Sequence, residues 1–216
     1  MKSVNWIDHL LNFISVILGV SMAFYASSWS ADRKDREASI NMIESLVSEL
    51  ERDINVYERF QLEQNKTQAE ILGRAIEYIQ QDQLDSLPIL LQRGIGFQNY
   101  APRKVTFNSM TSSGKMSLIE DYDLQIRIST FYDALVSEAL FRGESQVRFH
   151  NSHIIPLMIE STDLMNPNLD EIDLRKVSNI LIMYRRMILW KIEKYQELLE
   201  AGQALQAALN AYKSSL

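Results

Sequence analysis

Residues 10 to 26 form an uncharged run, LLNFISVILGVSMAFYA, near the start of the 216-residue chain. Trp6 and Trp29 flank this run, and indole rings favour the boundary between hydrocarbon and water. A helix from one Trp to the other would be roughly 34 Å long, which matches a hydrocarbon core with its interfaces. The run therefore predicts a transmembrane helix, with the two Trp side chains as its interface anchors.

Two other readings of the run are a cleaved signal peptide and a buried core helix. A signal peptide would have a more basic start and an A-x-A-like site at its end, whereas this chain begins with one Lys and has an early Asp8. A core helix rarely extends this far without a charge. We therefore expect a single-pass protein, with a membrane anchor and its flanks over residues 1–34 and a helical bundle domain over residues 35–216.

The charged residues on either side of the run bear on its orientation in the membrane. The charged sequence DRKDRE at residues 32–37 follows the run, and Lys2 precedes it. The count of Lys and Arg favours a cytoplasmic domain by a small margin. We leave the side of the membrane open.

Small residues recur along one face of the predicted membrane helix. Ser15, Gly19, Ala23 and Ser27 are spaced four apart, and residues at this spacing share a helix face. Small side chains at this spacing allow two helix backbones to approach closely. Asn12 adds a group that can form a hydrogen bond to a neighbouring helix. We expect the anchor to pair with itself or with the helix of a partner.

Composition favours an all-α fold and excludes several kinds of site. The chain has only seven Gly and four Pro, whereas a many-stranded fold needs frequent turns. It has no Cys, which removes disulfides, thiolate metal sites and Cys nucleophiles. The net charge of -6 argues against a nucleic-acid partner, because such proteins usually carry a basic face. We expect no cofactor.

From about residue 35 to 81 the pattern is helical and contains no Pro. Apolar residues alternate three and four apart, which is typical of a heptad seam. The seam consists of Ile40, Ile43, Val47, Leu50, Ile54 and Tyr57. It weakens at Gln61 and Asn65. We expect the membrane helix to continue into this one as a rod.

Residues 82–105 interrupt the helical pattern with two Pro and two Gly. We expect a short helix near residues 87–91 and another from Thr106, as its N-cap, to Gly114. Helix resumes from 121 to about 160, where Pro156 predicts a kink or a break. A polar loop follows at 161–168, and then an apolar stripe extends to the C-terminus. Three long amphipathic helices of this kind predict an antiparallel bundle.

Ser112, Ser113, Gly114 and Lys115 resemble part of a phosphate-binding loop. That loop needs a Gly separated by four residues from the Gly-Lys pair, a Ser or Thr after the pair and a preceding strand. Here residue 109 is Ser, residue 116 is Met and the context is helical. We therefore interpret these four residues as a structural turn, with Gly114 ending a helix in the left-handed conformation.

No strong catalytic motif is present. His150 and His153 are three apart and could share one metal ion, but a zinc site needs three or four ligands. Many of the Asp and Glu residues are expected on solvated faces, and no carboxylate pair stands out in an apolar setting. Arg148 and His153 match the Arg-x4-His pattern of HEPN-type ribonucleases, in which a polar residue usually follows the Arg; here it is Phe149.

Two segments together resemble a known family. One is the anchor with its exit, ISVILGVSMAFYASSWSADRKDRE, followed by ESLVSELERDI; the other is VTFNSMTSSGKMSLIEDYDLQIRISTFYDAL. They are similar to an uncharacterised family of bacterial single-pass membrane proteins, a domain of unknown function. The resemblance covers about the first two-thirds of the chain and implies architecture rather than activity. Members of that family have a more basic N-terminal tail.

These observations favour a non-enzymatic, membrane-anchored helical subunit or scaffold that assembles into a membrane protein complex through its anchor and heptad seam. Its partners would be the lipid bilayer and either further copies of the chain or another membrane protein. One alternative is an oligomeric effector of bacterial defence whose anchors form a pore, with Asn12, Ser15 and Ser21 offering polar groups. A second alternative is a HEPN-like ribonuclease or a metal-dependent hydrolase.

Overall fold

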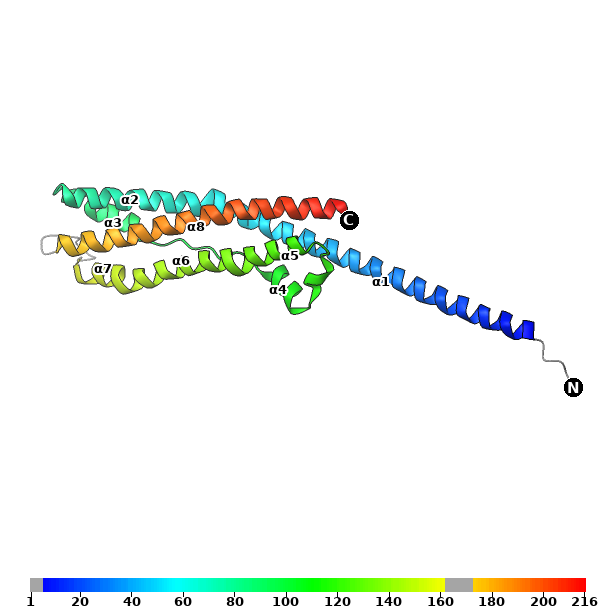
Figure 1. The fold of residues 1–216 in the computed structure, drawn as a ribbon. Coiled ribbons are helices and arrows are strands. Elements are labelled where there is room, and N and C mark those ends of the chain that lie inside the picture. Colours follow the sequence, from blue (N-terminus) through cyan, green and yellow to red (C-terminus); the bar gives the residue numbers. More distant parts are fainter. Residues whose placement is uncertain (1–5, 162–172) are drawn as a thin grey trace.

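The structure is a computed structural model that describes residues 6–161 and 173–216. Side chains are described over residues 10–159 and 173–216. Within these ranges the chain is helical or irregular and contains no strand, so the all-α prediction is confirmed. Long helices lie side by side, and one of them extends far beyond the others toward the N-terminus (Figure 1).

The first rod carries the predicted anchor directly into the bundle. Helix α1 (Trp6–Val56) continues through a π-helical turn (Tyr57–Gln61) into α2 (Leu62–Gln80). Gln61 and Asn65, where the apolar seam weakens, are buried. A π turn has more residues per turn than an α-helix, so it keeps positions 57, 61 and 65 on the side that faces the bundle.

The second rod is a series of helices in line. Helix α5 (Tyr122–Ser129) leads through a π-helical turn (Thr130–Leu135) into α6 (Val136–Phe149). A further π turn (His150–Ile154) leads into α7 (Ile155–Ser161). The rod extends in the same direction as the first (Figure 1).

Helix α8 (Leu174–Ser215) is the third rod and lies antiparallel to the other two. Near its start, Arg185 Nε donates to the Ala69 carbonyl of α2 at 2.9 Å. Near its end, Lys213 Nζ pairs with Glu44 Oε1 of α1 at 2.7 Å. Helix α8 thus packs against α1, α2 and α6, and one continuous core forms along it. This arrangement confirms the predicted long-helix bundle.

The chain returns from the far end of the first rod to the start of the second by a mostly irregular connection. A short 3₁₀ turn (Leu84–Ser86) and α3 (Leu87–Gly94) lie against the end of α2. Residues 95–104 contain no helix and cross the bundle (Figure 1). Helix α4 (Val105–Ser112) and a 3₁₀ turn (Lys115–Leu118) then pack on α1. The two predicted short helices correspond to α3 and α4.

The predicted N-cap at Thr106 is wrong. Helix α4 begins one residue earlier, and its N-cap position, Lys104, makes no side-chain capping bond. The Thr106 hydroxyl instead donates to Glu49 Oε1 at 2.8 Å. A buried carboxylate from α1 therefore takes the hydroxyl that would otherwise cap the helix.

The helix does not break at Pro156, contrary to one of the two outcomes predicted for it. Pro156 is the second residue of α7, directly after the π turn that ends at Ile154. A Pro removes one backbone donor and crowds the preceding turn. In the π turn the backbone hydrogen bonds join residues five apart instead of four. The backbone groups before Pro156 are therefore arranged differently from those of an α-helix, and the chain remains helical through Pro156. The predicted polar loop at 161–168 lies almost wholly outside the described residues.

Candidate functional site

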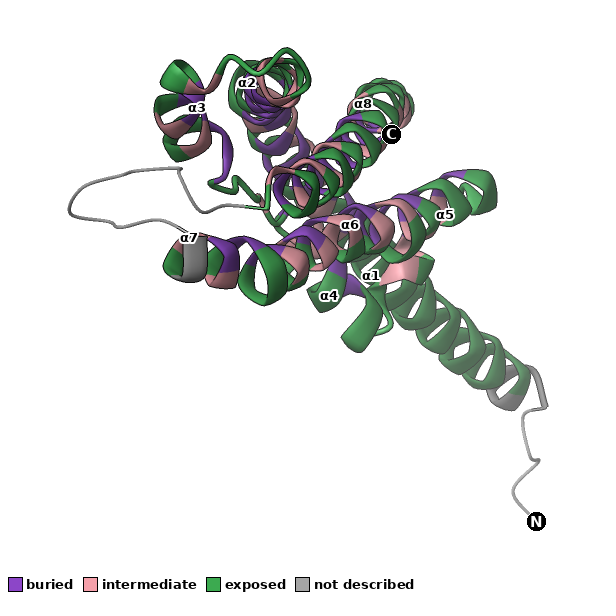
Figure 2. Ribbon diagram, turned by 90° about the vertical axis from the view of Figure 1, so that its left-hand side faces the viewer, coloured by how far each residue is buried: buried purple, intermediate pink, exposed green. Residues whose placement is uncertain are grey.

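The N-terminal part of α1 stands apart from the bundle and is apolar. Every described side chain from residue 10 to 37 is exposed, and Figure 2 shows this length of helix projecting beyond the core. Leu18 and Phe24 are examples, exposed by 58% and 73%. Within the described residues one helix is long and apolar enough to cross a membrane, and this is that helix. An apolar surface of this extent calls for a bilayer or a partner to cover it.

The small-residue ridge lies on this exposed length. Ser15, Gly19, Ala23 and Ser27 are all left exposed by the part of the chain that the structure describes, as is Asn12. A Cβ built on Gly19 would meet no atom within 4 Å. The ridge therefore has no packing role inside the single chain. Trp29, the anchor at the bundle end, is also exposed, whereas the Trp6 side chain lies outside the described residues.

The heptad seam, by contrast, is used within the chain. Ile43, Leu50 and Tyr57 are buried, and the ring of Tyr57 packs edge-on against Tyr195 of α8 with centroids 4.8 Å apart. Ile40, Val47 and Ile54 are half-buried. The seam faces α8 of the same chain and leaves little apolar surface for a second copy.

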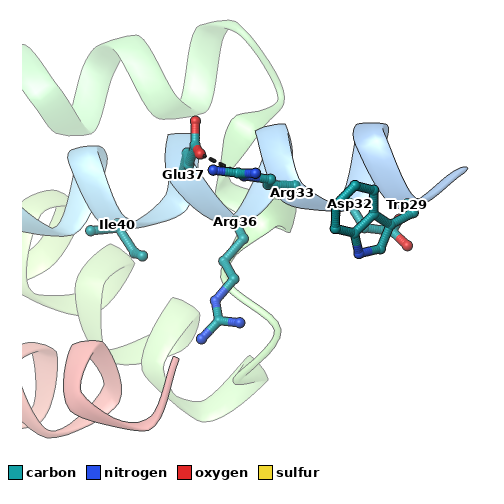
Figure 3. A pocket seen from close by; sticks show the side chains of 6 residues that line it. All are labelled: Trp29, Asp32, Arg33, Arg36, Glu37 and Ile40. Atoms are coloured by element: carbon teal, nitrogen blue, oxygen red, sulfur yellow. Dashed lines mark hydrogen bonds and ion pairs between the residues drawn. The ribbon is translucent and has the colours of Figure 1, made fainter. Parts of the chain in front are cut away.

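A groove of about 600 Å³ follows α1 where it leaves the bundle. Its lining residues are Trp29, Asp32, Arg33, Arg36, Glu37 and Ile40. Arg33 Nε pairs with Glu37 Oε1 at 3.2 Å. Figure 3 shows the Arg36 side chain extending away from that pair, toward the end of α8. The groove thus contains one paired and one separate guanidinium beside an indole ring.

A second hollow of about 210 Å³ adjoins the groove. It is enclosed by α1, the end of α8 and the chain around the 3₁₀ turn at Lys115–Leu118. Its lining residues are Asp32, Asp35, Arg36, Ser39, Leu118, Glu120, Tyr212 and Leu216. The hydroxyl of Tyr212 accepts the backbone N–H of Glu120 at 2.9 Å, which joins two walls of the hollow. Ser39 is only 2% exposed, and its Oγ has no hydrogen-bond partner within residues 6–161 and 173–216.

The Ser-Ser-Gly-Lys segment, residues 112–115, forms the turn that joins the end of α4 to the 3₁₀ turn at Lys115–Leu118. Gly114 has φ of 71°, in the left-handed region that Gly adopts without strain. Ser113 Oγ donates back to the Ser109 carbonyl at 2.6 Å, while Ser112 and Lys115 are exposed. The segment lies where we expected a structural turn, and its side-chain bonds hold its own backbone.

Two neighbouring carboxylates of α1 are buried, although no carboxylate pair was expected in an apolar setting. Glu49 and Asp53 of α1 are 7% and 2% exposed. Glu49 accepts the Thr106 N–H at 3.2 Å. Asp53 accepts the Tyr100 hydroxyl at 2.7 Å and the Arg103 N–H at 3.1 Å. Burial raises the pKa of Asp53 despite these bonds. Asp53 therefore attaches the crossing segment, residues 95–104, to α1, and Glu49 attaches the start of α4.

Lys191 of α8 is fully buried and attaches the same segment from the other side. Its Nζ donates to the Gln98 carbonyl at 2.8 Å, to Asn99 Oδ1 at 3.1 Å and to Gln146 Oε1 of α6. Burial lowers the pKa of Lys191 to about 7. Three oxygen acceptors match the three protons of an ammonium group, so this group is a structural cross-link rather than an open nucleophile.

The candidate ribonuclease residues do not converge. Arg148 pairs with Glu144 of the preceding turn at 3.5 Å. The ring of His153 lies against Phe149, with centroids 4.6 Å apart. His150 is buried and His153 is exposed, so the two rings do not share an open face. No group of three His, Cys, Asp or Glu side chains with metal-binding geometry occurs among the described residues.

Sequence reasoning missed the buried polar network and the junction hollow. A signal for the network was present. Gln61 and Gln68 continue the spacing of the seam beyond Tyr57 while breaking its apolar character, and Asp53 lies at helical spacing from both Leu50 and Tyr57. Lys191 likewise lies within the apolar stripe of the last helix. The hollow had no such signal, since it forms only when the ends of distant segments meet.

Comparison with protein-family models, curated proteins and solved structures finds no match for this chain. The case for its function therefore depends on its own residues and geometry.

Proposed function

We propose that the protein is a non-enzymatic helical subunit or scaffold that is anchored in a membrane by α1 and assembles into a membrane complex through that helix. One observation carries the proposal: an exposed apolar helix with a ridge of small residues extends from a bundle whose own seam is buried. The bilayer would cover the apolar surface of α1, and a neighbouring helix would pack on the ridge.

The sequence led us to expect assembly through both the anchor and the heptad seam, whereas we now propose the anchor alone. The heptad seam packs on α8 of the same chain, so it is unsuited to pairing two copies. The ridge from Ser15 to Ser27 is uncovered and has room for a close neighbour, as the open space around Gly19 illustrates. Assembly is therefore assigned to the anchor, in a bacterial cytoplasmic membrane.

The absence of catalysis stays a prediction, supported by how the reactive side chains are used. Lys191 and Asp53, the least ordinary ionisable groups, have hydrogen-bond partners on the crossing segment and hold it in place. Arg148 and His153 interact with different neighbours. In each case a structural role accounts for the side chain.

The test is a gentle detergent extraction of the full chain from its native membrane, followed by particle mass and mass spectrometry of the co-eluting proteins. A defined complex with a second membrane protein supports the subunit or scaffold. A closed homo-oligomer that conducts ions in liposomes supports the pore-forming effector instead. A monodisperse monomer at all gentle detergent conditions would contradict assembly through the anchor.

A further inference from the structure

We propose that the junction of α1 with the bundle is a binding site for a phosphatidylethanolamine headgroup, with the lipid phosphate on Arg36 and the ammonium group in the adjoining acidic hollow. The inference rests on the proposed function in one respect, which is that α1 spans a bilayer. It adds a specific lipid and a specific site.

The position of the groove along α1 fits the headgroup layer. Trp29 lies at the start of the groove, at the level where indole rings meet the interface. The Arg36 backbone lies roughly 10 Å further along the helix axis, at 1.5 Å per residue. A long Arg side chain carries its charge several ångström from the backbone, and the Arg36 guanidinium extends toward the end of α8, where the hollow adjoins the groove. A lipid beside α1 would thus present its phosphate between Trp29 and Arg36.

Arg36 is the cation best placed to bind that phosphate. Its side chain lines both the groove and the hollow, and it has no ion-pair partner among the described side chains. Arg33, the other guanidinium of the groove, is paired with Glu37. A guanidinium binds a phosphate through two parallel N–H bonds. The guanidinium group of Arg36 is therefore available, among the described side chains, to bind a phosphate where the groove and the hollow meet.

The hollow beyond Arg36 is suited to a small ammonium group. Asp32, Asp35 and Glu120 contribute carboxylates to its lining, and Tyr212 contributes a phenol ring. Ser39 also lines the hollow, and its buried hydroxyl has no hydrogen-bond partner among the described residues. An ammonium group has three N–H donors and no acceptor, so these oxygens suit it. They repel a second negative charge.

This charge pattern selects among the common phospholipids. One free guanidinium next to three carboxylates matches a neutral headgroup that carries both a phosphate and a cation. An anionic glycerol headgroup would bring no cation to the carboxylates. A choline headgroup has no N–H to donate to them, although it is also zwitterionic. Ethanolamine supplies both the charge and the donors.

Native mass spectrometry of the full chain in a mild detergent tests the site. Phosphatidylethanolamine, phosphatidylcholine and phosphatidylglycerol are each added at the same molar ratio. We expect retention of one phosphatidylethanolamine per chain, with about tenfold weaker retention of the other two, since one charged hydrogen bond is worth that much. Arg36→Gln and Asp35→Asn should each reduce this retention several-fold. Equal retention of the three lipids by the wild-type chain overturns the proposal.

Matched controls come from the same helix. Lys34→Gln removes a cation two residues from Arg36 that lines neither cavity, and Glu51→Gln removes a carboxylate well away from the hollow. Both should bind lipid as the wild type does. If Lys34→Gln weakens retention as much as Arg36→Gln, general electrostatic attraction explains the binding and the specific site is wrong.

Two further arms separate this inference from the proposed function. Soluble glycerophosphoethanolamine should fail to displace the lipid at equal concentration; if it competes equally, the site binds a free phosphate compound and not a lipid. Flotation of the full chain with vesicles reports the anchor independently. A chain that floats but shows no lipid preference refutes the headgroup site alone, whereas a chain that does not float refutes the anchor as well.

Discussion

The Tyr100 hydroxyl donates to the carboxylate of Asp53 over 2.7 Å, which joins the crossing segment to α1 inside the bundle. The same carboxylate accepts the Arg103 N–H. Asp53→Ala would remove both of these charged hydrogen bonds at a buried position of α1, so we expect a loss of about 1–3 kcal/mol in the free energy of unfolding. Urea denaturation of the full chain in detergent measures this loss.

Two variants set the scale for that measurement. Tyr100→Phe removes one of the two donors and keeps the ring, and it should cost about 1 kcal/mol. Asp133→Ala removes an exposed carboxylate of the second rod and should change stability by less than about 0.5 kcal/mol. Equal effects of Asp53→Ala and Asp133→Ala would show that the buried bond contributes nothing.

The buried ammonium of Lys191 predicts a rise in stability toward alkaline pH. Burial lowers the pKa of Lys191 to about 7 in the folded chain, from an ordinary 10.5. Between these values the unfolded chain binds more protons than the folded one, so the free energy of unfolding increases with pH. The slope has an upper limit of about 1.4 kcal/mol per pH unit.

Thermal unfolding between about pH 7 and 9.5 tests the role of Lys191 in this slope. Above that range tyrosines of the unfolded chain ionise, while burial raises the pKa of Tyr100 and Tyr184 to about 12 in the fold, and stability falls again. Lys191→Met should flatten the rise, and Lys115→Met, an exposed change, should leave it intact. A slope that persists in Lys191→Met contradicts the assignment.

Gly143 provides a test of how closely the crossing segment approaches the second rod. A Cβ at this buried helical position would lie 3.1 Å from the side chain of Asn99. Asn99 is held by the Gly143 carbonyl and by Lys191 Nζ, so it has little freedom to move. Gly143→Ala should therefore destabilise the protein by about 1 kcal/mol, although Ala is the better helix former. Gly96→Ala, where a Cβ meets nothing within 4 Å, should be neutral or stabilising in the same denaturation assay.

The small-residue ridge predicts a position-specific effect on assembly. Gly19→Leu adds bulk to the ridge without touching the rest of the chain, so it should reduce the oligomer fraction without altering the fold. Ser21→Leu makes a comparable change two residues away, on the opposite face of the helix. Particle mass in mild detergent should drop for Gly19→Leu alone. The same drop in both variants would indicate a general effect of hydrophobicity, not packing on the ridge.

The all-α fold and its three rods followed from apolar periodicity. Stripes such as Ile43, Leu50 and Tyr57 repeat at helical spacing over dozens of residues, and long amphipathic helices have few ways to bury such stripes. The left-handed conformation of Gly114 was also predictable from sequence. A Gly that directly follows a helix end adopts this conformation for local steric reasons, without help from distant segments.

The polar part of the structure was beyond the same reasoning. Whether Asp53 or Lys191 faces water or the core depends on segments tens of residues away, since the groups that satisfy them come from the crossing connection. The helix start before Thr106 was missed for the same reason, because Glu49 takes its hydroxyl. The cavities at the junction arise only from the meeting of α1, the 3₁₀ turn and the end of α8.

The most direct test of the account is to locate α1 relative to the bilayer. The chain has no Cys, so single substitutions Ser3→Cys, Met22→Cys and Ser86→Cys can be labelled in sealed membranes with a maleimide that does not cross the bilayer. If α1 spans the bilayer, Ser3→Cys and Ser86→Cys react from opposite sides of the membrane and Met22→Cys reacts from neither side. Labelling of the first and third positions from the same side, or ready labelling of Met22→Cys, would contradict a membrane-spanning α1.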